Sequence, residues 1–382
     1  MKQHVTILGS TGSIGTQSLS VVSAHPERFD VFALCAGRNT ELLIDQAHIF
    51  HPKFVSSESD FDEARLPDGT KRLHGPHAME EIASMDESGT VVGGVSGIRQ
   101  LPSLLCALKS GKRVALANKE SIVCGHSLVN EAVRSGSGVL IPVDSEQSAI
   151  FQCLSGSPSS GSDQVDHVLL TASGGPFWTL PYSEWQHITP EMALKHPTWN
   201  MGNIITVNSA TLFNKGLEII EACYLFHLPP EKIRVVIHPQ SILHSAVSFA
   251  DGSILANLAV TDMRIPIQYA MTWPDRIASP TRSFTLSDLN GLSFFPADPD
   301  RFRALLLAYE CVREGGSAPV IYNASNEQAV LMFLQGKLRF DEIQSVVEDA
   351  LSGIPHSSPE TLEEIMELDL NVRKAVASRS RF

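Results

Sequence analysis

A short apolar strand that runs into a glycine-rich turn is the feature of this sequence that most constrains its fold. Residues 5–8 read Val-Thr-Ile-Leu, and Gly9, Gly12 and Gly15 follow at once, before a helical pattern over residues 18–22. In dinucleotide-binding α/β folds such glycines let the backbone approach a pyrophosphate, and the helix N-terminus supplies N–H donors. The alternative is a tight turn without a ligand, and the G-x-x-G-x-x-G spacing departs from the usual NAD fingerprint.

The second predicted strand, residues 31–35, leads into Gly37, Arg38 and Asn39. Enzymes that use NAD usually place an acidic residue after this strand, where it binds the ribose 2′-hydroxyl. Arginine instead suits a 2′-phosphate, because its guanidinium forms charge-assisted hydrogen bonds with phosphate. The pattern therefore favours NADP over NAD. An ordinary surface arginine is the alternative.

Apolar runs and helical stretches continue to alternate up to residue 143. This alternation predicts a doubly wound, Rossmann-like parallel sheet at the start of an α/β protein. The remaining strands are expected at 54–55, 90–92, 114–116 and 139–143, with helices that include 101–110 and 121–134. Ligands bind at the carboxyl ends of strands in such sheets. Asn118, Lys119 and Glu120 follow one of these ends, although Lys119 could also be only a lysine at a helix start.

The pattern changes near residue 144 and again near residue 298. The middle of the chain predicts a strand at 165–171, a helix at 209–226, a strand at 233–237 and a hairpin within 247–259, which together indicate an α+β domain. The last 85 residues show four helical stretches typical of a small bundle. We therefore predict a cofactor-binding domain (1–143), a catalytic domain (144–274), a surface linker (275–297) and a helical domain (298–382).

Charge and composition exclude several classes of partner. The chain of 382 residues carries 29 basic and 42 acidic residues, a net charge of −13, which argues against nucleic acid or an anionic membrane as the main partner. No apolar run approaches the ~18 residues that cross a bilayer. The six cysteines form no C-x-x-C pair, so we expect reduced thiols and a cytoplasmic location.

Two acids, Asp144 and Glu146, follow the buried strand at 139–143. Residues two apart in an extended chain point to the same side, so the two carboxylates should converge. Such a pair repels unless one acid holds a proton or a cation lies between them. An all-carboxylate site favours Mg²⁺ or Mn²⁺ over zinc. A solvated strand exit, or a helix N-cap with its first-turn acid, remains an alternative.

Polar groups suited to an anion gather further along the chain. Asn214, Lys215 and Glu218 lie three and four residues apart, so they share one face of the predicted helix. Ser173 precedes two glycines, a pattern that can form a backbone nest for an anion. An exposed Lys–Glu pair is the alternative for the helix. Trp199 lies in a polar, turn-rich loop and is either a small core contact or part of a lid.

Ordered motifs that cover nearly the whole chain resemble the 1-deoxy-D-xylulose-5-phosphate reductoisomerase family. They lie at residues 9–15, 116–121, 142–146, 173–177, 209–218 and 237–241, with a further match at 323–327. The resemblance implies rearrangement of 1-deoxy-D-xylulose 5-phosphate and its reduction by NADPH to 2-C-methyl-D-erythritol 4-phosphate. This reaction is a step of non-mevalonate isoprenoid synthesis. The implied metal is Mg²⁺ or Mn²⁺, with Co²⁺ possible, and the implied assembly is a homodimer.

The resemblance also implies roles for individual residues. The metal ligands are Asp144, Glu146 and Glu218, and the catalytic set adds His196 and Trp199 from a mobile loop. The substrate-binding residues are Ser145, Glu146, Ser173, His196, Ser209, Asn214, Lys215, Glu218, His244 and Met263. The cofactor-binding residues are Gly9, Ser10, Thr11, Gly12, Ser13, Ile14, Gly15, Gly37, Arg38, Asn39, Asn118, Lys119, Glu120 and Gly202.

The sequence departs from the family pattern at four positions. Gln147 stands where the family usually has His, Asn208 where it has Asp, Thr261 where it has Pro, and Arg38 where it has Lys. Gln147 and Asn208 leave the substrate affinity and the pH profile open, but not the reaction class. Two other functions stay open: a metal-independent NADP dehydrogenase with structural acids, and an NADP-sensing protein without turnover.

Overall fold

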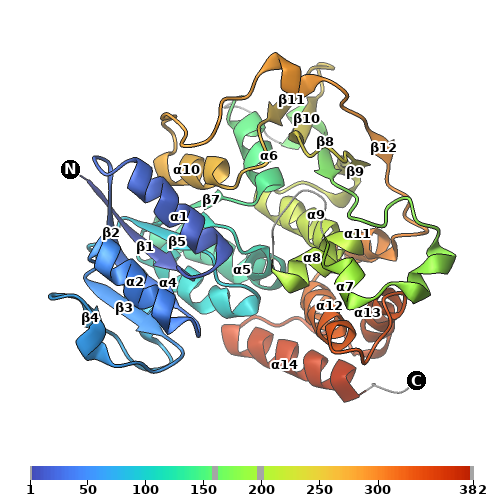
Figure 1. Cartoon of the computed structure of the whole chain (residues 1–382). Helices are drawn as coiled ribbons and strands as arrows, with labels where there is room; N and C mark the ends of the chain where they lie inside the picture. Colours follow the sequence, from blue (N-terminus) through green and yellow to red (C-terminus); the bar gives the residue numbers. More distant parts are fainter. Residues whose placement is uncertain (1, 157–161, 196–201, 379–382) are drawn as a thin grey trace. The chain divides into compact units, whose positions relative to one another are not determined.

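A computed structural model describes residues 2–156, 162–195 and 202–378 (Figure 1). Contacts divide the chain into two compact units. The first unit comprises Met1–Ser121, Gly125–Ser148 and Asp262–Ser283. The second unit comprises Ile122–Cys124, Ala149–Thr261 and Phe284–Phe382. Among the described residues, no helix has the length and apolar character needed to cross a membrane.

The first unit is built on a seven-stranded sheet in the order β4-β3-β2-β1-β5-β6-β7, and every neighbouring pair is parallel. The strands are β1 (Gln3–Leu8), β2 (Phe29–Ala36), β3 (Phe54–Ser57), β4 (Lys71–Arg72), β5 (Thr90–Gly93), β6 (Arg113–Leu116) and β7 (Val139–Pro142). The strand order reverses between β1 and β5, which confirms the predicted doubly wound sheet and marks its ligand-binding crevice.

Helices and short 3₁₀ turns connect these strands. They are α1 (Ser13–Ala24), α2 (Thr40–Phe50), η1 (Glu63–Arg65), α3 (Ala78–Ser84), η2 (Ile98–Gln100), α4 (Leu101–Lys109) and α5 (Lys119–Gly136). The inner strands are apolar along most of their length because both faces are covered, as a parallel sheet requires. Strand β7 is an edge strand, and Val139 at its start is exposed, so only its second half is buried as expected.

Helix α10 (Arg264–Thr272) packs against α1, β6 and β7 of the first unit. Two hydrogen bonds fix it there: Arg113 Nη1 donates to the Met271 carbonyl at 2.9 Å, and a ring nitrogen of His25 lies 3.0 Å from the Gln268 side-chain oxygen. The chain therefore returns to the first unit over Asp262–Ser283. The sequence analysis assigned residues 144–274 to the catalytic domain. The division into cofactor-binding, catalytic and helical domains remains a prediction.

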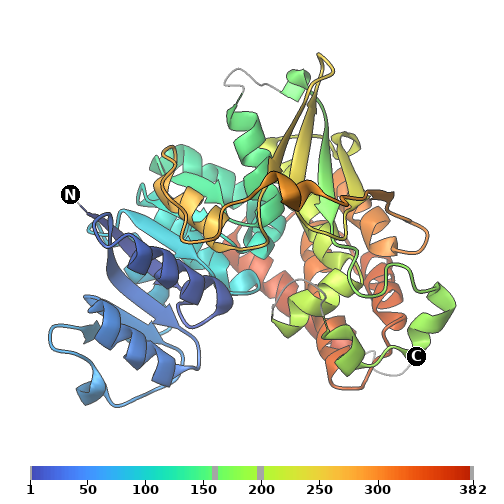
Figure 2. The same cartoon turned by 45° about the horizontal axis from the view of Figure 1, so that its top comes forward.

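The second unit contains a mixed five-stranded sheet in the order β11-β10-β8-β9-β12. Its strands are β8 (Val165–Ala172), β9 (Ile233–Ile237), β10 (Leu243–Phe249), β11 (Ile254–Leu258) and β12 (Phe295–Pro296). Strands β8 and β9 are parallel, whereas β10 is antiparallel to both β8 and β11. The hairpin predicted within residues 247–259 is confirmed, with Asp251 in its turn, and its strands project at the edge of this sheet (Figure 2).

Helices of the second unit come from the middle and from the end of the chain. They are α7 (Pro190–Ala193), α8 (Asn203–Ala210), α9 (Phe213–Phe226), α11 (Arg303–Glu314), α12 (Ala318–Leu334), α13 (Glu342–Gly353) and α14 (Leu362–Ser378), with 3₁₀ turns η3 (Ser162–Gln164), η4 (Tyr182–His187), η5 (Pro230–Lys232) and η6 (Leu286–Leu289). Helix α6 (Ser145–Ser155) is divided between the two units. The four C-terminal helices confirm the predicted helical stretches.

The prediction of one continuous helix over residues 209–226 is wrong. Leu212 adopts a left-handed backbone conformation with φ of +59°, which an α-helix cannot contain. Helix α8 therefore ends at Ala210 and α9 begins at Phe213. The break turns the chain between two helices that each carry predicted site residues.

Candidate active site

The glycine-rich turn after β1 is packed so tightly that only glycine fits at two of its positions. Gly9 has a φ of +83°, and a Cβ there would lie 2.7 Å from the Gly94 carbonyl oxygen. A Cβ at Gly15 would lie 2.3 Å from the Gly9 carbonyl oxygen. Gly12 is the N-cap of α1, whose first turn contains no acidic residue. The turn thus leaves a helix N-terminus and bare backbone available to an anion, as a pyrophosphate site requires.

Neighbouring elements hold this turn in place. The N–H groups of Gly9 and Ser10 donate to the Cys35 carbonyl of β2 at 2.9 and 2.8 Å. The buried Gln46 of α2 donates to the Ser10 carbonyl at 2.9 Å. The other predicted cofactor contacts of the turn are half-buried or exposed, namely Thr11, Ser13 and Ile14. The structure therefore fits the proposed role of this turn without placing a cofactor in it.

The other predicted cofactor residues follow β2 and β6. Arg38 is exposed, Gly37 is half-buried, and Asn39 caps α2 by accepting a hydrogen bond from Leu42 N–H at 3.2 Å. Asn118 caps α5 by accepting from Ser121 N–H at 2.9 Å.

Asn118 and Glu120 also brace the loop that follows β5. The Asn118 amide nitrogen donates to the Val95 and Gly97 carbonyls at 2.9 and 3.0 Å. Glu120 accepts from Asn118 at 2.9 Å through one carboxylate oxygen and from Gly97 N–H at 3.4 Å through the other. These two residues therefore shape the crevice, and their contact with a cofactor remains a prediction.

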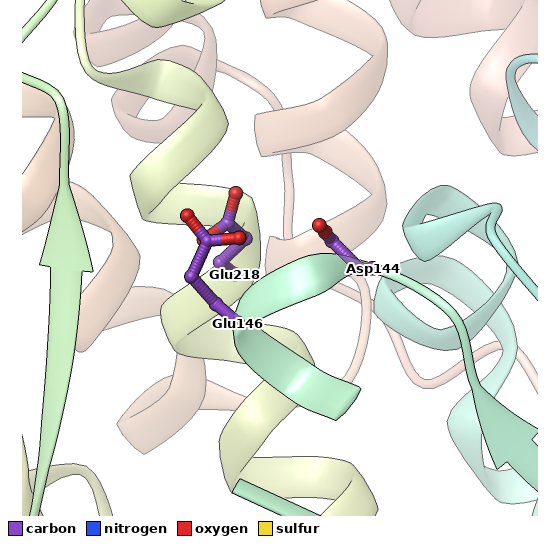
Figure 3. Close-up of side chains that lie close together, drawn as sticks. All are labelled: Asp144, Glu146 and Glu218. Atoms are coloured by element: carbon purple, nitrogen blue, oxygen red, sulfur yellow. The ribbon is translucent and has the colours of Figure 1, made fainter. Parts of the chain in front are cut away.

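The three carboxylates that the resemblance assigned to a metal lie close together. One oxygen each of Asp144, Glu146 and Glu218 lies within 4.8 Å of the others (Figure 3). Glu218 is buried, and the other two residues are half-buried. Asp144 follows β7 as expected, but the chain does not stay extended: Glu146 lies in the first turn of α6. The local geometry is thus that of a helix start, and the turn of α6 brings the carboxylates together.

Cationic and polar side chains surround these acids. Lys119 forms an ion pair with Asp144, and Lys215 forms one with Glu218. The Asn214 amide donates to Glu218, and the Ser145 hydroxyl donates to Glu146. Lys215 and Glu218 are only 3% and 1% exposed, which contradicts the alternative of an exposed surface pair. Carboxylates that lie this close together and are this buried need positive charge beside them. Their oxygens are ligands that suit a hard divalent cation.

The turn after β8 abuts the end of α8. Gly174 and Gly175 have φ values of +86° and +68°, and a Cβ at Gly175 would lie 2.7 Å from the Ser209 carbonyl oxygen. Ser173 is half-buried, and its hydroxyl accepts a hydrogen bond from Gly175 N–H at 3.3 Å. Because of this close approach, Ser173 and Ser209 belong to one local cluster of the second unit. Asn214 and Lys215 begin the next helix, only five and six residues after Ser209.

Helix α12 supports the helices that carry this cluster. The Asn326 amide nitrogen donates to the Asn208 side-chain oxygen at 2.9 Å, and both residues are buried. Tyr322 packs on Phe213 with ring centroids 5.3 Å apart, and its hydroxyl donates to the Ala304 carbonyl at 2.9 Å. Sequence reasoning matched the motif at 323–327 to the family but assigned it no role. All five residues of this motif are buried.

The remaining predicted residues are more scattered. His244 is buried in β10, Met263 occupies the N-cap position of α10 in the first unit, and Gly202 is the exposed N-cap of α8. His196 and Trp199 lie outside the described residues. Of the residues that depart from the family pattern, Gln147 is fully buried and Thr261 is half-buried.

His238 has a structural explanation. Its side chain is fully buried, and its Nε2 accepts from the N–H groups of Ile242 and Leu243, both at 3.2 Å. Nδ1 therefore carries the proton, which it donates to the Ser293 carbonyl at 2.9 Å. With both ring nitrogens engaged, His238 fixes the turn that leads to His244.

Known proteins match this chain along nearly its whole length. Family models described as DXP reductoisomerase match residues 5–126, 140–226 and 258–375. The 1-deoxy-D-xylulose 5-phosphate reductoisomerase of Paraburkholderia xenovorans is 45% identical over 99% of this chain and 96% of its own length. The enzyme from Zymomonas mobilis in complex with NADPH is 38% identical, with a TM-score of 0.92 and full coverage of both chains.

A second solved structure is similar in the same way. It is a DOX-P reductoisomerase in complex with NADPH, fosmidomycin and magnesium. The two chains are 36% identical, the match covers 99% of this chain and 98% of the other, and the TM-score is 0.93.

The support of α9 by α12 can be tested at Gly216. A Cβ there would lie 1.9 Å from the Tyr322 hydroxyl and 3.0 Å from the Ala304 carbonyl. Replacing a glycine inside a helix by alanine usually stabilises the helix by about 1 kcal/mol. We expect Gly216→Ala instead to lower the free energy of unfolding by about 1–3 kcal/mol, because the methyl group overpacks this contact. Urea unfolding followed by circular dichroism measures the change.

Gly89→Ala is the matched control, since the nearest atom to a Cβ at Gly89 lies 3.8 Å away. We expect this control to change the unfolding free energy by no more than about 0.5 kcal/mol. A Gly216→Ala protein as stable as the wild type would mean that α9 does not depend on close packing against Tyr322.

Proposed function

The chain belongs to the 1-deoxy-D-xylulose 5-phosphate reductoisomerase family, and we propose that it converts 1-deoxy-D-xylulose 5-phosphate into 2-C-methyl-D-erythritol 4-phosphate with NADPH and a divalent cation. The reaction is a step of non-mevalonate isoprenoid synthesis. The observation that carries the proposal is the group of three carboxylates, Asp144, Glu146 and Glu218, in a chain that also has the glycine-rich nucleotide turn.

The nucleotide would bind at the carboxyl edge of the seven-stranded sheet. The turn at Gly9, Gly12 and Gly15 would receive the pyrophosphate, because backbone N–H groups and the α1 N-terminus are available there. Arg38, exposed directly after β2, would pair with the adenosine 2′-phosphate. With the adenosine half bound in these positions, the nicotinamide would lie on the other side of the crevice, at the carboxyl ends of β5 and β6.

Asp144, Glu146 and Glu218 would hold the cation, with Mg²⁺ or Mn²⁺ as the ions that suit three carboxylates. When bound, such an ion polarises a carbonyl oxygen and orients neighbouring hydroxyl groups. Ser145, Asn214 and the two lysines contact these acids and thereby fix their orientation. Fixed orientation matters because a bond migration needs its reacting atoms aligned.

Ser173, Ser209, Asn214 and Lys215 would bind the phosphate and the nearby oxygens of the substrate. Lys215 supplies positive charge, the serines and asparagine supply polar groups, and the first turn of α9 adds its N-terminal dipole. Glu218 lies one turn further along the same helix. These residues would thus bind the phosphate at one end of the substrate, and the other end of the substrate would lie at the three carboxylates.

Exclusion of water is the remaining requirement, since hydride must reach the aldehyde before water does. His196 and Trp199 were assigned to a lid by resemblance, and because they lie outside the described residues this role stays a prediction. The same holds for His244, Met263 and Gly202 as contacts of substrate or cofactor.

One assay separates the proposed reaction from both alternatives. NADPH absorbance is followed after addition of 1-deoxy-D-xylulose 5-phosphate, with Mg²⁺ and then with excess EDTA. We expect oxidation of NADPH only with the metal. Turnover that persists in EDTA would indicate a metal-independent dehydrogenase, and NADPH binding without turnover would indicate a sensor.

Replacing Glu218 by Gln tests the carboxylate group itself. The change keeps the shape of the side chain and removes one charge from the proposed ligand set, so we expect the apparent Mn²⁺ affinity to fall at least tenfold, equivalent to ~1.4 kcal/mol. Titration of activity with Mn²⁺ measures this affinity, and circular dichroism checks the fold. Glu231→Gln is the matched control, because Glu231 is exposed and pairs with Arg313. If both variants keep the wild-type affinity, Glu218 is not a ligand.

We also propose a homodimer, which the edge strand β11 supports. Ile254 and Leu255 of β11 are 56% and 42% exposed at the open end of the five-stranded sheet. An apolar edge of this kind tends to pair with another strand. Light scattering after gel filtration should give twice the chain mass, and Ile254→Lys should shift the protein toward monomer. A wild-type monomer at micromolar concentration would refute the proposal.

The predicted cytoplasmic location is consistent with the state of the cysteines. All six lie within the described residues, none forms a disulfide there, and five of them are buried. Burial raises the pKa of the Cys35 and Cys223 thiols to about 12, which keeps them protonated and unreactive at neutral pH. The location itself remains a prediction.

A further inference from the structure

An ion pair crosses the ligand-binding edge of the seven-stranded sheet. Arg99 Nη1 lies 2.8 Å from a carboxylate oxygen of Glu58. Glu58 directly follows β3, whereas Arg99 lies in η2, a few residues after β5. Strands β2 and β1 lie between β3 and β5 in the sheet. With neighbouring strands about 4.8 Å apart, the two side chains bridge a span of about 14 Å across the ends of β1 and β2.

The two turns beneath this span are those to which we assign the nucleotide. The loop after β5 touches the turn after β1, because a Cβ at Gly9 would meet the Gly94 carbonyl at 2.7 Å. Glu58 lies beside the turn after β2, since a Cβ at Gly37 would lie 3.8 Å from its other carboxylate oxygen. In a doubly wound sheet the adenosine half of the nucleotide occupies this edge. The ion pair therefore lies where the adenosine ribose would bind.

The backbone on both sides of the pair is well anchored. The Gln100 side chain accepts from Val95 N–H at 2.9 Å, and Asn118 holds Val95 and Gly97 as described above. Glu58 N–H donates to the Ala36 and Gly37 carbonyls. The side chains themselves are exposed, 64% for Arg99 and 50% for Glu58. Exposed pairs contribute little stability, so a better anion can replace the carboxylate at small cost.

We propose that Arg99 is a second determinant of NADPH specificity, which binds the 2′-phosphate together with Arg38, and that Glu58 holds Arg99 across the adenosine site before the nucleotide arrives. The inference rests on the proposed function. A phosphate carries more charge than a carboxylate and offers three acceptor oxygens, so it displaces Glu58 from Arg99. NADH has no phosphate at this position, so it leaves the Arg99–Glu58 ion pair intact and gains nothing from Arg99.

Direct nucleotide binding tests this proposal without turnover. The fluorescence of NADPH and of NADH is titrated with wild-type protein, Arg99→Ala and Glu58→Gln, and 2′,5′-ADP serves as a competitor that lacks the nicotinamide. We expect Arg99→Ala to weaken NADPH and 2′,5′-ADP about tenfold or more, the range for a lost hydrogen bond to a charged group. NADH should change less than twofold in this variant. In Glu58→Gln, NADPH should bind as tightly as in the wild type or more tightly.

Arg65→Ala is the matched control. Arg65 is another exposed arginine of the first unit and forms two hydrogen bonds of 2.7 Å with Glu41. The Arg65→Ala substitution should leave the affinities for NADPH and NADH unchanged. If Arg99→Ala weakens both nucleotides equally, or neither, the role of Arg99 is wrong. If the wild type binds NADPH no better than NADH, the proposed NADPH dependence fails as well, so the two failures can be told apart.

Discussion

The close approach of Asp144, Glu146 and Glu218 is the electrostatic constraint on which the site depends. Two unit charges of the same sign repel by about 4 kcal/mol at 4 Å and an effective dielectric constant of 20. Three carboxylates within 4.8 Å are therefore costly unless cations lie beside them. Lys119 and Lys215 provide two positive charges, and a divalent cation at the acids would free both lysines to contact a phosphorylated substrate.

The C-terminal helices have a part in this arrangement although they contribute none of the predicted site residues. Helix α12 meets α9 at Gly216, which lies between Lys215 and Glu218, and it meets α8 at Asn208, next to Ser209. Because these contacts are buried and leave no room for a methyl group at Gly216, they fix the spacing of the two helices. We infer that the helical end of the chain positions the residues that we propose to bind the substrate phosphate.

Much of this architecture could be predicted from sequence because strand and helix periodicities are local. The glycine turn, the doubly wound sheet and the hairpin at Asp251 belong to this class. The break at Leu212 could not be predicted, since no glycine or proline marks its positive φ. The convergence of Asp144 and Glu146 was expected for a wrong local reason, because a helix begins where an extended chain was assumed. The Arg99–Glu58 pair joins loops 41 residues apart, a contact that no periodicity reveals.

The most direct test of the central claim is where a divalent ion binds. Crystals grown with Mn²⁺ and NADPH, measured near the manganese absorption edge, would show the ion by its anomalous scattering. We predict one strong peak about 2.0–2.3 Å from oxygens of Asp144, Glu146 and Glu218, the range for hard cations with carboxylate ligands. A peak elsewhere, or no peak with Lys119 and Lys215 still paired to Asp144 and Glu218, would contradict the claim that these carboxylates form a metal site.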